Sequence, residues 1–60
     1  MDFEKIGQFL RALRKERNLT QDQLAAELNF DRSVISKWEC SKKLPSVENI
    51  DALAKFYNVS

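Results

Sequence analysis

The chain has 60 residues and a net charge of +1 at pH 7, with 43% hydrophobic and 32% charged residues. A chain of this length forms at most one domain, here residues 1–60, and its core is too small to enclose a deep substrate cavity. No apolar run exceeds three residues, so we expect neither a membrane span nor a signal peptide.

One glycine and one proline favour helices over a fold with many tight turns. The single cysteine, Cys40, leaves no internal disulfide, so the fold has to depend on its core. Together these features predict an all-α protein of the reducing cytoplasm. The thiol itself is either an incidental surface group, which we favour, or a site of redox control or of a disulfide between two chains.

The first predicted helix begins after Asp2, whose side chain suits the N-cap position, and ends at Asn18, which tolerates the left-handed conformation. Its apolar residues recur at three- and four-residue spacing: Phe3, Ile6, Leu10 and Leu13. Phe9 is a further apolar residue that either covers the edge of the core, which we favour, or is exposed and marks a partner site.

A second helix is predicted to begin after Thr20, which is a good N-cap. Gln23 follows three residues later and completes a capping box. Asn29 is expected to end this helix in the left-handed conformation. The small residues Ala25 and Ala26 allow a neighbouring helix to approach closely.

The third predicted helix follows the N-cap Asp31 and has two distinct faces. At about 100° per residue, one arc of about 140° holds the residues expected to pack inward: Val34, Ile35, Trp38 and Glu39. The opposite arc, also of about 140°, holds polar residues: Arg32, Ser33, Ser36, Lys37 and Cys40. Because Trp38 lies on the same side as Ile35, we interpret it as a core residue and not as a base-stacking one.

Pro45 and Ser46 precede a fourth predicted helix, with Ser46 as N-cap and Asn49 at the third helical position. Its apolar stripe consists of Val47, Ile50, Leu53, Ala54 and Tyr57. Between the second and third helices only "NF" and Asp31 remain, and so short a link forces the helices to cross steeply, as in a helix-turn-helix. Phe30 is expected to fill the corner between them.

The basic residues are unevenly distributed despite the small net charge. Residues 5–17 contain five basic residues and one acidic residue, and residues 32–43 contain four and one. The other acidic residues lie elsewhere in the chain, so the fold can present a one-sided electric field. Most charges of the first helix are nevertheless expected to form an ordinary solvated face.

The runs "LRKERNLTQDQLAAELNFDRSVISKWE" and "KKLPSVENIDALAKFYNVS" cover nearly the whole chain. In them the sequence resembles the Cro/phage-repressor (XRE-like) helix-turn-helix family. The resemblance implies a compact all-α bundle of four helices, or a truncated bundle of five, that binds double-stranded DNA, usually as a dimer. The third predicted helix would then be the recognition helix, over residues 31–40, and would lie in the major groove.

The resemblance also implies roles for individual residues. Arg14 and Glu39 would form a structural salt bridge that ties the first helix to the recognition helix. The residues facing base edges would be Arg32, Ser33, Ser36 and Lys37. The residues contacting DNA phosphates would be Gln21, at the start of the second helix, and Ser41, Lys42 and Lys43, in the loop after the third.

Physical chemistry supports these roles. An arginine can pair with both major-groove acceptors of guanine, and a lysine can do the same with less geometric selectivity. Serine is short and can contact a base, a phosphate or a water. Lysines beside phosphates release counterions, which gives affinity without sequence preference. Backbone amides at the start of the second helix suit a phosphate oxygen.

Some features depart from the family pattern. Asn29 and Ser41 stand where the family commonly has glycine, and Phe9 stands where it often has a basic residue. Asn29 is a mild change, because asparagine accepts positive φ. The family's usual fifth helix, often part of the dimer contact, has no counterpart in the 60 residues. One interpretation is that the chain is a fragment.

The leading interpretation is a sequence-specific transcription regulator that binds a near-palindromic operator as a homodimer, with recognition helices about 34 Å apart. The alternative is a protein-interaction module, an antitoxin or the DNA-binding head of a larger regulator, with a partner held by Phe9 and the fourth helix. An enzyme is not expected, because the chain has no histidine, its lone cysteine has no imidazole to activate it, and Gly7 lies inside a helix rather than a phosphate loop. No residue spacing indicates a metal site, and no cofactor is expected.

Overall fold

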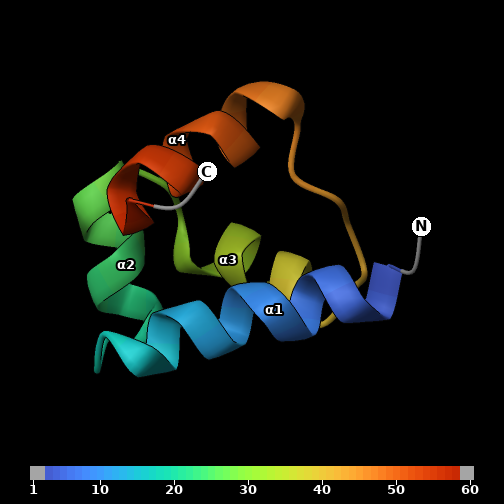
Figure 1. Cartoon of the computed structure of the whole chain (residues 1–60), viewed down its shortest axis with the longest axis horizontal. Coiled ribbons are helices and arrows are strands. Elements are labelled where there is room, and N and C mark those ends of the chain that lie inside the picture. The colour runs from blue at the N-terminus through green and yellow to red at the C-terminus, as the bar shows by residue number, and fades with distance from the viewer. Residues whose placement is uncertain (1–2, 59–60) are drawn as a thin grey trace.

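The structure, a computed structural model, describes residues 3–58, with side chains from residue 4 onward. The predicted cap at Asp2 and the side chain of Phe3 lie outside the described residues. Within residues 3–58 the chain forms four helices and no strand: α1 (Phe3–Glu16), α2 (Gln21–Leu28), α3 (Arg32–Glu39) and α4 (Val47–Tyr57) (Figure 1). The predicted all-α fold is confirmed.

Local capping signals set the ends of α1 and α2. The Thr20 hydroxyl accepts a hydrogen bond from the Gln23 amide at 3.0 Å, and the Gln23 side chain accepts one from the Thr20 amide at 2.8 Å. The predicted capping box is therefore confirmed. Asn18 and Asn29 have φ values of 58° and 62°, in the left-handed region that closes a helix, as predicted.

The N-caps of α3 and α4 differ. Asp31 occupies the N-cap position of α3, as predicted, but its side chain makes no capping hydrogen bond. Its backbone carbonyl accepts hydrogen bonds from the amides of Val34 and Ile35 at 3.0 and 3.4 Å. At α4 the Ser46 hydroxyl accepts a hydrogen bond from the Asn49 amide at 3.2 Å, which confirms this cap.

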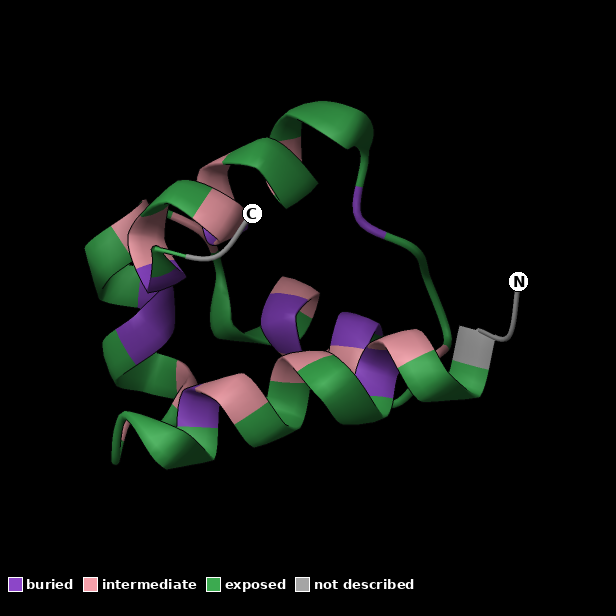
Figure 2. Cartoon of the chain, in the orientation of Figure 1, coloured by how far each residue is buried: buried purple, intermediate pink, exposed green. Residues whose placement is uncertain are grey.

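The core lies where α2, α3 and α4 face one another. Its buried residues are Leu24, Ala25, Ile35, Trp38, Leu53 and Tyr57. Figure 2 shows the buried positions turned towards the interior that the helices share. The Phe30 ring meets Trp38 edge-on, with ring centroids 5.3 Å apart, so Phe30 fills the corner of the helix-turn-helix as expected.

The only glycine, Gly7, marks the place where α1 crosses the C-terminal end of α3. A Cβ atom here would lie 2.8 Å from the carbonyl oxygens of both Trp38 and Glu39, and 2.6 Å from the hydroxyl oxygen of Ser41. These distances are too short for a methyl group, so the absence of a side chain allows the two backbones to meet. In Figure 1, α3 accordingly lies close behind α1.

The chain leaves α3 through a turn at Ser41, which has a φ of 62°. Glycine adopts this conformation readily, whereas a serine pays about 1–2 kcal/mol for it. The amides of Lys42 and Lys43 donate to the Lys37 carbonyl at 2.9 and 3.3 Å. These bonds fold the start of the loop back onto the last turn of α3.

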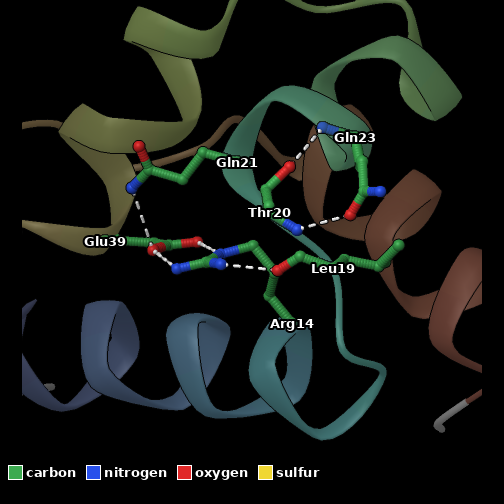
Figure 3. A network of polar contacts seen from close by, with 6 residues as sticks. All are labelled: Arg14, Leu19, Thr20, Gln21, Gln23 and Glu39. Atoms are coloured by element: carbon green, nitrogen blue, oxygen red, sulfur yellow. Dashed lines mark hydrogen bonds and ion pairs between the residues drawn. The ribbon is translucent and has the colours of Figure 1, made fainter.

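A buried ion pair joins α1 to the end of α3 (Figure 3). Arg14 Nε lies 2.7 Å from Glu39 Oε2, and Arg14 Nη2 donates to Glu39 Oε1 at 2.9 Å. The two side chains are only 10% and 4% exposed. Arg14 Nη1 also donates to the Leu19 carbonyl at 2.6 Å, and Gln21 Nε2 donates to Glu39 Oε1 at 3.2 Å. The hydrogen bond to Glu39 raises the pKa of Arg14, which keeps the guanidinium charged.

A second contact ties the end of α4 to the turn that follows α1. Arg17 Nη2 donates to the Tyr57 carbonyl at 2.5 Å, and the guanidinium carbon lies 5.7 Å from the centre of the Tyr57 ring. The Tyr57 hydroxyl is buried and has no hydrogen-bond partner among the described residues. Burial raises the pKa of Tyr57, and the nearby charge of Glu39 adds to this effect.

Gly7→Ala is expected to lower the free energy of unfolding by about 1–3 kcal/mol, because the added methyl group overpacks the contact between α1 and α3. Helix propensity alone would act in the opposite direction by about 1 kcal/mol. Urea denaturation measures the difference. Gln8→Ala, at the exposed neighbouring position, is the control and should stay within about 0.5 kcal/mol. A stabilised Gly7→Ala protein would show that α1 does not pack on α3 in this way.

Glu39→Gln is expected to lower the free energy of unfolding by about 3–5 kcal/mol, because it leaves the buried Arg14 guanidinium without its counter-charge. The matched control is Asp51→Asn, which removes the carboxylate of an exposed ion pair with Lys55 on α4 and should cost less than about 1 kcal/mol. Thermal or urea denaturation of both variants measures the contrast. Equal, small costs in the two proteins would contradict the structural role of the Arg14–Glu39 pair.

Tyr57→Phe is expected to leave the free energy of unfolding at neutral pH unchanged or to raise it by about 1 kcal/mol, because it removes a buried hydroxyl without a partner. In the unfolded chain a tyrosine has a pKa of about 10. Since the folded pKa is higher, the wild type should lose stability as the pH rises above that value, and the variant should lack this part of the loss. Denaturation at a series of alkaline pH values tests this, and parallel losses in the two proteins would refute it.

Candidate nucleic-acid interface

The structure separates the two faces of α3 in the way that the helical period predicts. Ile35 and Trp38 are buried in the core. On the opposite face, Arg32 and Lys37 are exposed, and so is Ser33. The third helix therefore buries its apolar side and turns its cations to solvent.

The exposed face of α3 is hollowed. A depression of about 280 Å³ is lined by Arg32, Ser33, Ser36, Lys37, Cys40 and Lys42. The structure thus brings together all four residues predicted to face base edges and one of those predicted to contact phosphates. Three of the lining residues are cations and none is acidic, so the depression is electropositive. The thiol of Cys40 is free and exposed beside them.

The residues of the loop after α3 differ in exposure. Lys42 and Lys43 are exposed on the turn that the Lys37 carbonyl holds. Ser41 is half-buried, and its hydroxyl lies against α1 at Gly7. The two lysines are therefore open to a phosphate, whereas Ser41 is engaged within the fold.

Gln21, predicted to contact a phosphate, is half-buried at the start of α2. Its side-chain amide donates to Glu39 and so belongs to the network around Arg14 (Figure 3). An amide nitrogen carries two hydrogens, and this bond uses one of them. The first residue of α2 is thereby fixed relative to the end of α3.

Arg32 has an acidic neighbour that the sequence did not predict. Its Nε atom lies 3.5 Å from Oδ1 of Asp22, the second residue of α2, and the two side chains are 58% and 80% exposed. The ion pair lies at the surface, so Arg32 is not enclosed by the bundle. No sequence signal indicates this pair, because the contact depends on the angle at which α2 and α3 cross.

An apolar groove of about 220 Å³ lies between α1 and α4. It is lined by Phe9, Leu10, Leu13, Ile50, Leu53, Ala54 and Tyr57. Phe9 is 58% exposed, so the favoured interpretation, that it covers the edge of the core, is wrong. The position of α4 relative to α1, which no local pattern reports, decides this exposure.

In the part of the chain that the structure describes, no three His, Cys, Asp or Glu side chains are grouped so that they could hold a metal ion. None of the helices in residues 3–58 has both the length and the apolar character needed to cross a bilayer.

Several proteins with related sequences are named as regulators. Over 56 residues the chain is 45% identical to the HTH-type transcriptional activator BcrR of Enterococcus faecalis, covering 93% of this chain and 28% of that protein. Over 49 residues it is 43% identical to the Immunity repressor protein of Bacillus phage phi105, covering 82% of this chain and 34% of that protein. The ImmF control region 10 kDa protein of the same phage is 30% identical over 59 residues, covering 98% of this chain and 66% of that protein. No solved structure matches the chain.

The chain therefore spans about a third or less of the length of the first two of these relatives. A family model described as helix-turn-helix matches residues 10–60. This range contains α2, α3 and the turn between them, together with every residue predicted to contact DNA. The match confirms the predicted resemblance and agrees with the four-helix fold. The chain belongs to the helix-turn-helix family.

Proposed function

We propose that residues 1–60 form a single domain that binds double-stranded DNA in a sequence-specific manner and so regulates transcription. In this proposal α3 lies in the major groove, and Arg32, Ser33, Ser36 and Lys37 face base edges. The observation that carries the proposal is their grouping around one electropositive depression on the side of α3 opposite the core. Arginine and lysine there can pair with guanine, and the two serines with several base edges.

Sequence-independent affinity is assigned to the loop after α3 and to the start of α2. Lys42 and Lys43 are exposed and would neutralise phosphates, with release of counterions. Gln21 would contact a phosphate with the second hydrogen of its amide. Ser41 is half-buried against α1, and the contact with the DNA backbone that we assign to it rests on the family resemblance alone. The network that fixes Gln21 to Glu39 supports a constant docking angle of α3.

The DNA-bound form is proposed to be a homodimer on a near-palindromic operator. Two copies of α3 would then lie one turn of DNA apart, about 34 Å. The apolar groove between α1 and α4 supports a partner of this kind, since Phe9 and Ile50 are exposed at its edge. The relatives include a named activator and a named repressor, so the proposal concerns binding and not the direction of regulation.

The second candidate is a protein-interaction module, such as an antitoxin or the head of a larger regulator. The same apolar groove favours it, and the greater length of the relatives is consistent with a domain of a larger protein. In either case the role is binding in the cytoplasm, without catalysis or a cofactor. Salt separates the two candidates, because affinity for DNA falls steeply with ionic strength and contact through an apolar groove does not.

Selection from a random pool of duplex DNA is expected to enrich a near-palindromic site. On that site, Arg32→Ala should lower discrimination at one base position by about 1–3 kcal/mol, because it removes a base contact. Lys43→Ala should weaken binding to all sequences alike and reduce the slope of log K against log salt concentration by about 1. Fluorescence anisotropy titrations at several salt concentrations measure both effects.

The control for these titrations is Lys55→Ala, which removes an exposed cation from α4 and should change neither property. If no sequence is enriched, and if affinity for duplex DNA does not depend on salt, the interaction module becomes the better explanation. Identical behaviour of Arg32→Ala and Lys43→Ala would contradict the division between base and phosphate contacts.

A further inference from the structure

We propose that Asp22 is a positioning residue that sets the base preference of Arg32. Its carboxylate holds the guanidinium on the Nε side and leaves the two terminal amino groups to pair with a base. The inference rests on the proposed function, because it gives Asp22 a role only if Arg32 reads DNA.

The fold brings the two side chains together from different helices. Asp22 is the second residue of α2 and Arg32 is the first residue of α3, and the crossing of these two helices brings the side chains within ion-pair distance. The ion pair joins Nε of Arg32 to Oδ1 of Asp22 at 3.5 Å. A guanidinium presents its donors as a rigid planar fork, so a contact at Nε restrains the direction in which the terminal donors point.

The exposure of the pair suits a role in positioning. The Arg32 side chain is 58% exposed and that of Asp22 is 80% exposed. An ion pair in such a setting is weak, so it favours one set of arginine rotamers without withdrawing the side chain from solvent. Arg32 remains on the edge of the depression that the other candidate base contacts line.

The charge of Asp22 also acts on DNA directly. It follows Gln21, a proposed phosphate contact, so the carboxylate would lie near the negatively charged backbone. Repulsion between Asp22 and phosphates lowers the affinity for every sequence. At the base that Arg32 prefers, the free energy gained from the well-oriented contact offsets this repulsion. At any other base there is no such gain, and the repulsion remains. Asp22 therefore lowers non-specific binding more than specific binding, which raises the ratio between them.

A competing account makes Asp22 an inhibitor, which withdraws Arg32 from DNA until the pair breaks. The two accounts predict opposite changes in discrimination. If Asp22 positions Arg32, its removal reduces the preference for the correct base. If Asp22 competes with the base for Arg32, its removal strengthens the contact with the correct base and increases that preference.

The test compares the dissociation constants of Asp22→Asn and the wild type for two duplexes. One is the selected operator, and the other is the same operator with the base that Arg32 contacts replaced. We expect the variant to bind the replaced site more tightly than the wild type does. The ratio of the dissociation constant for the replaced site to that for the selected operator should therefore be lower by about two- to fivefold. Asp22→Glu restores a carboxylate and should recover part of the ratio. Asp51→Asn, which removes an exposed carboxylate from α4, should leave the ratio unchanged.

Repeating the comparison in an Arg32→Ala background completes a double-mutant cycle. There Asp22→Asn should tighten both sites equally, with no change in their ratio. An unchanged or increased ratio for Asp22→Asn in the presence of Arg32 overturns the positioning role. If Arg32→Ala itself leaves the ratio unchanged, the assignment of Arg32 as a base contact fails, and this inference fails with it. A ratio that Asp22→Asn lowers only when Arg32 is present supports the positioning role. An unchanged urea midpoint of the variant excludes a defect of folding as the cause.

Discussion

The arrangement of the helices depends on the ion pair between Arg14 and Glu39. It joins α1 to the end of α3 across 25 positions of sequence. It also has partners at the turn after α1, through Leu19, and at the start of α2, through Gln21. Two buried charges are costly to desolvate, and here every oxygen of the carboxylate and three nitrogens of the guanidinium find partners, which offsets that cost. One contact thus fixes the end of α3 relative to both preceding helices.

Much of the fold could be predicted from the sequence, because its signals are local. The capping box of Thr20 and Gln23 involves atoms three residues apart, and the left-handed Asn29 closes its own helix. The burial of Ile35 and Trp38 follows from the helical period alone. Asp31 shows the limit of this reasoning: its residue type suits a cap, yet the side chain does not bond the helix that follows.

The parts that could not be predicted depend on how separate helices meet. Phe9 has the same apolar character whether it is covered or exposed, and the position of α4 decides which. Gln21 was predicted to contact a phosphate. Its hydrogen bond to Glu39 could not be predicted, because it depends on the fold placing the end of α3 beside the start of α2. The pairing of Asp22 with Arg32 has the same origin. A candidate interface was therefore predictable as a set of side chains, but the partners that orient those side chains were not.

The turn after α3 has a thermodynamic consequence. Its backbone is already bonded to the Lys37 carbonyl through the amides of Lys42 and Lys43. A duplex docking there would restrict rotation about side-chain bonds and would not have to order the main chain, so the entropic penalty of association stays small. Such an encounter joins two preformed surfaces. Its heat-capacity change should be modest compared with that of a segment that folds as it binds, and diffusion and charge should govern its rate.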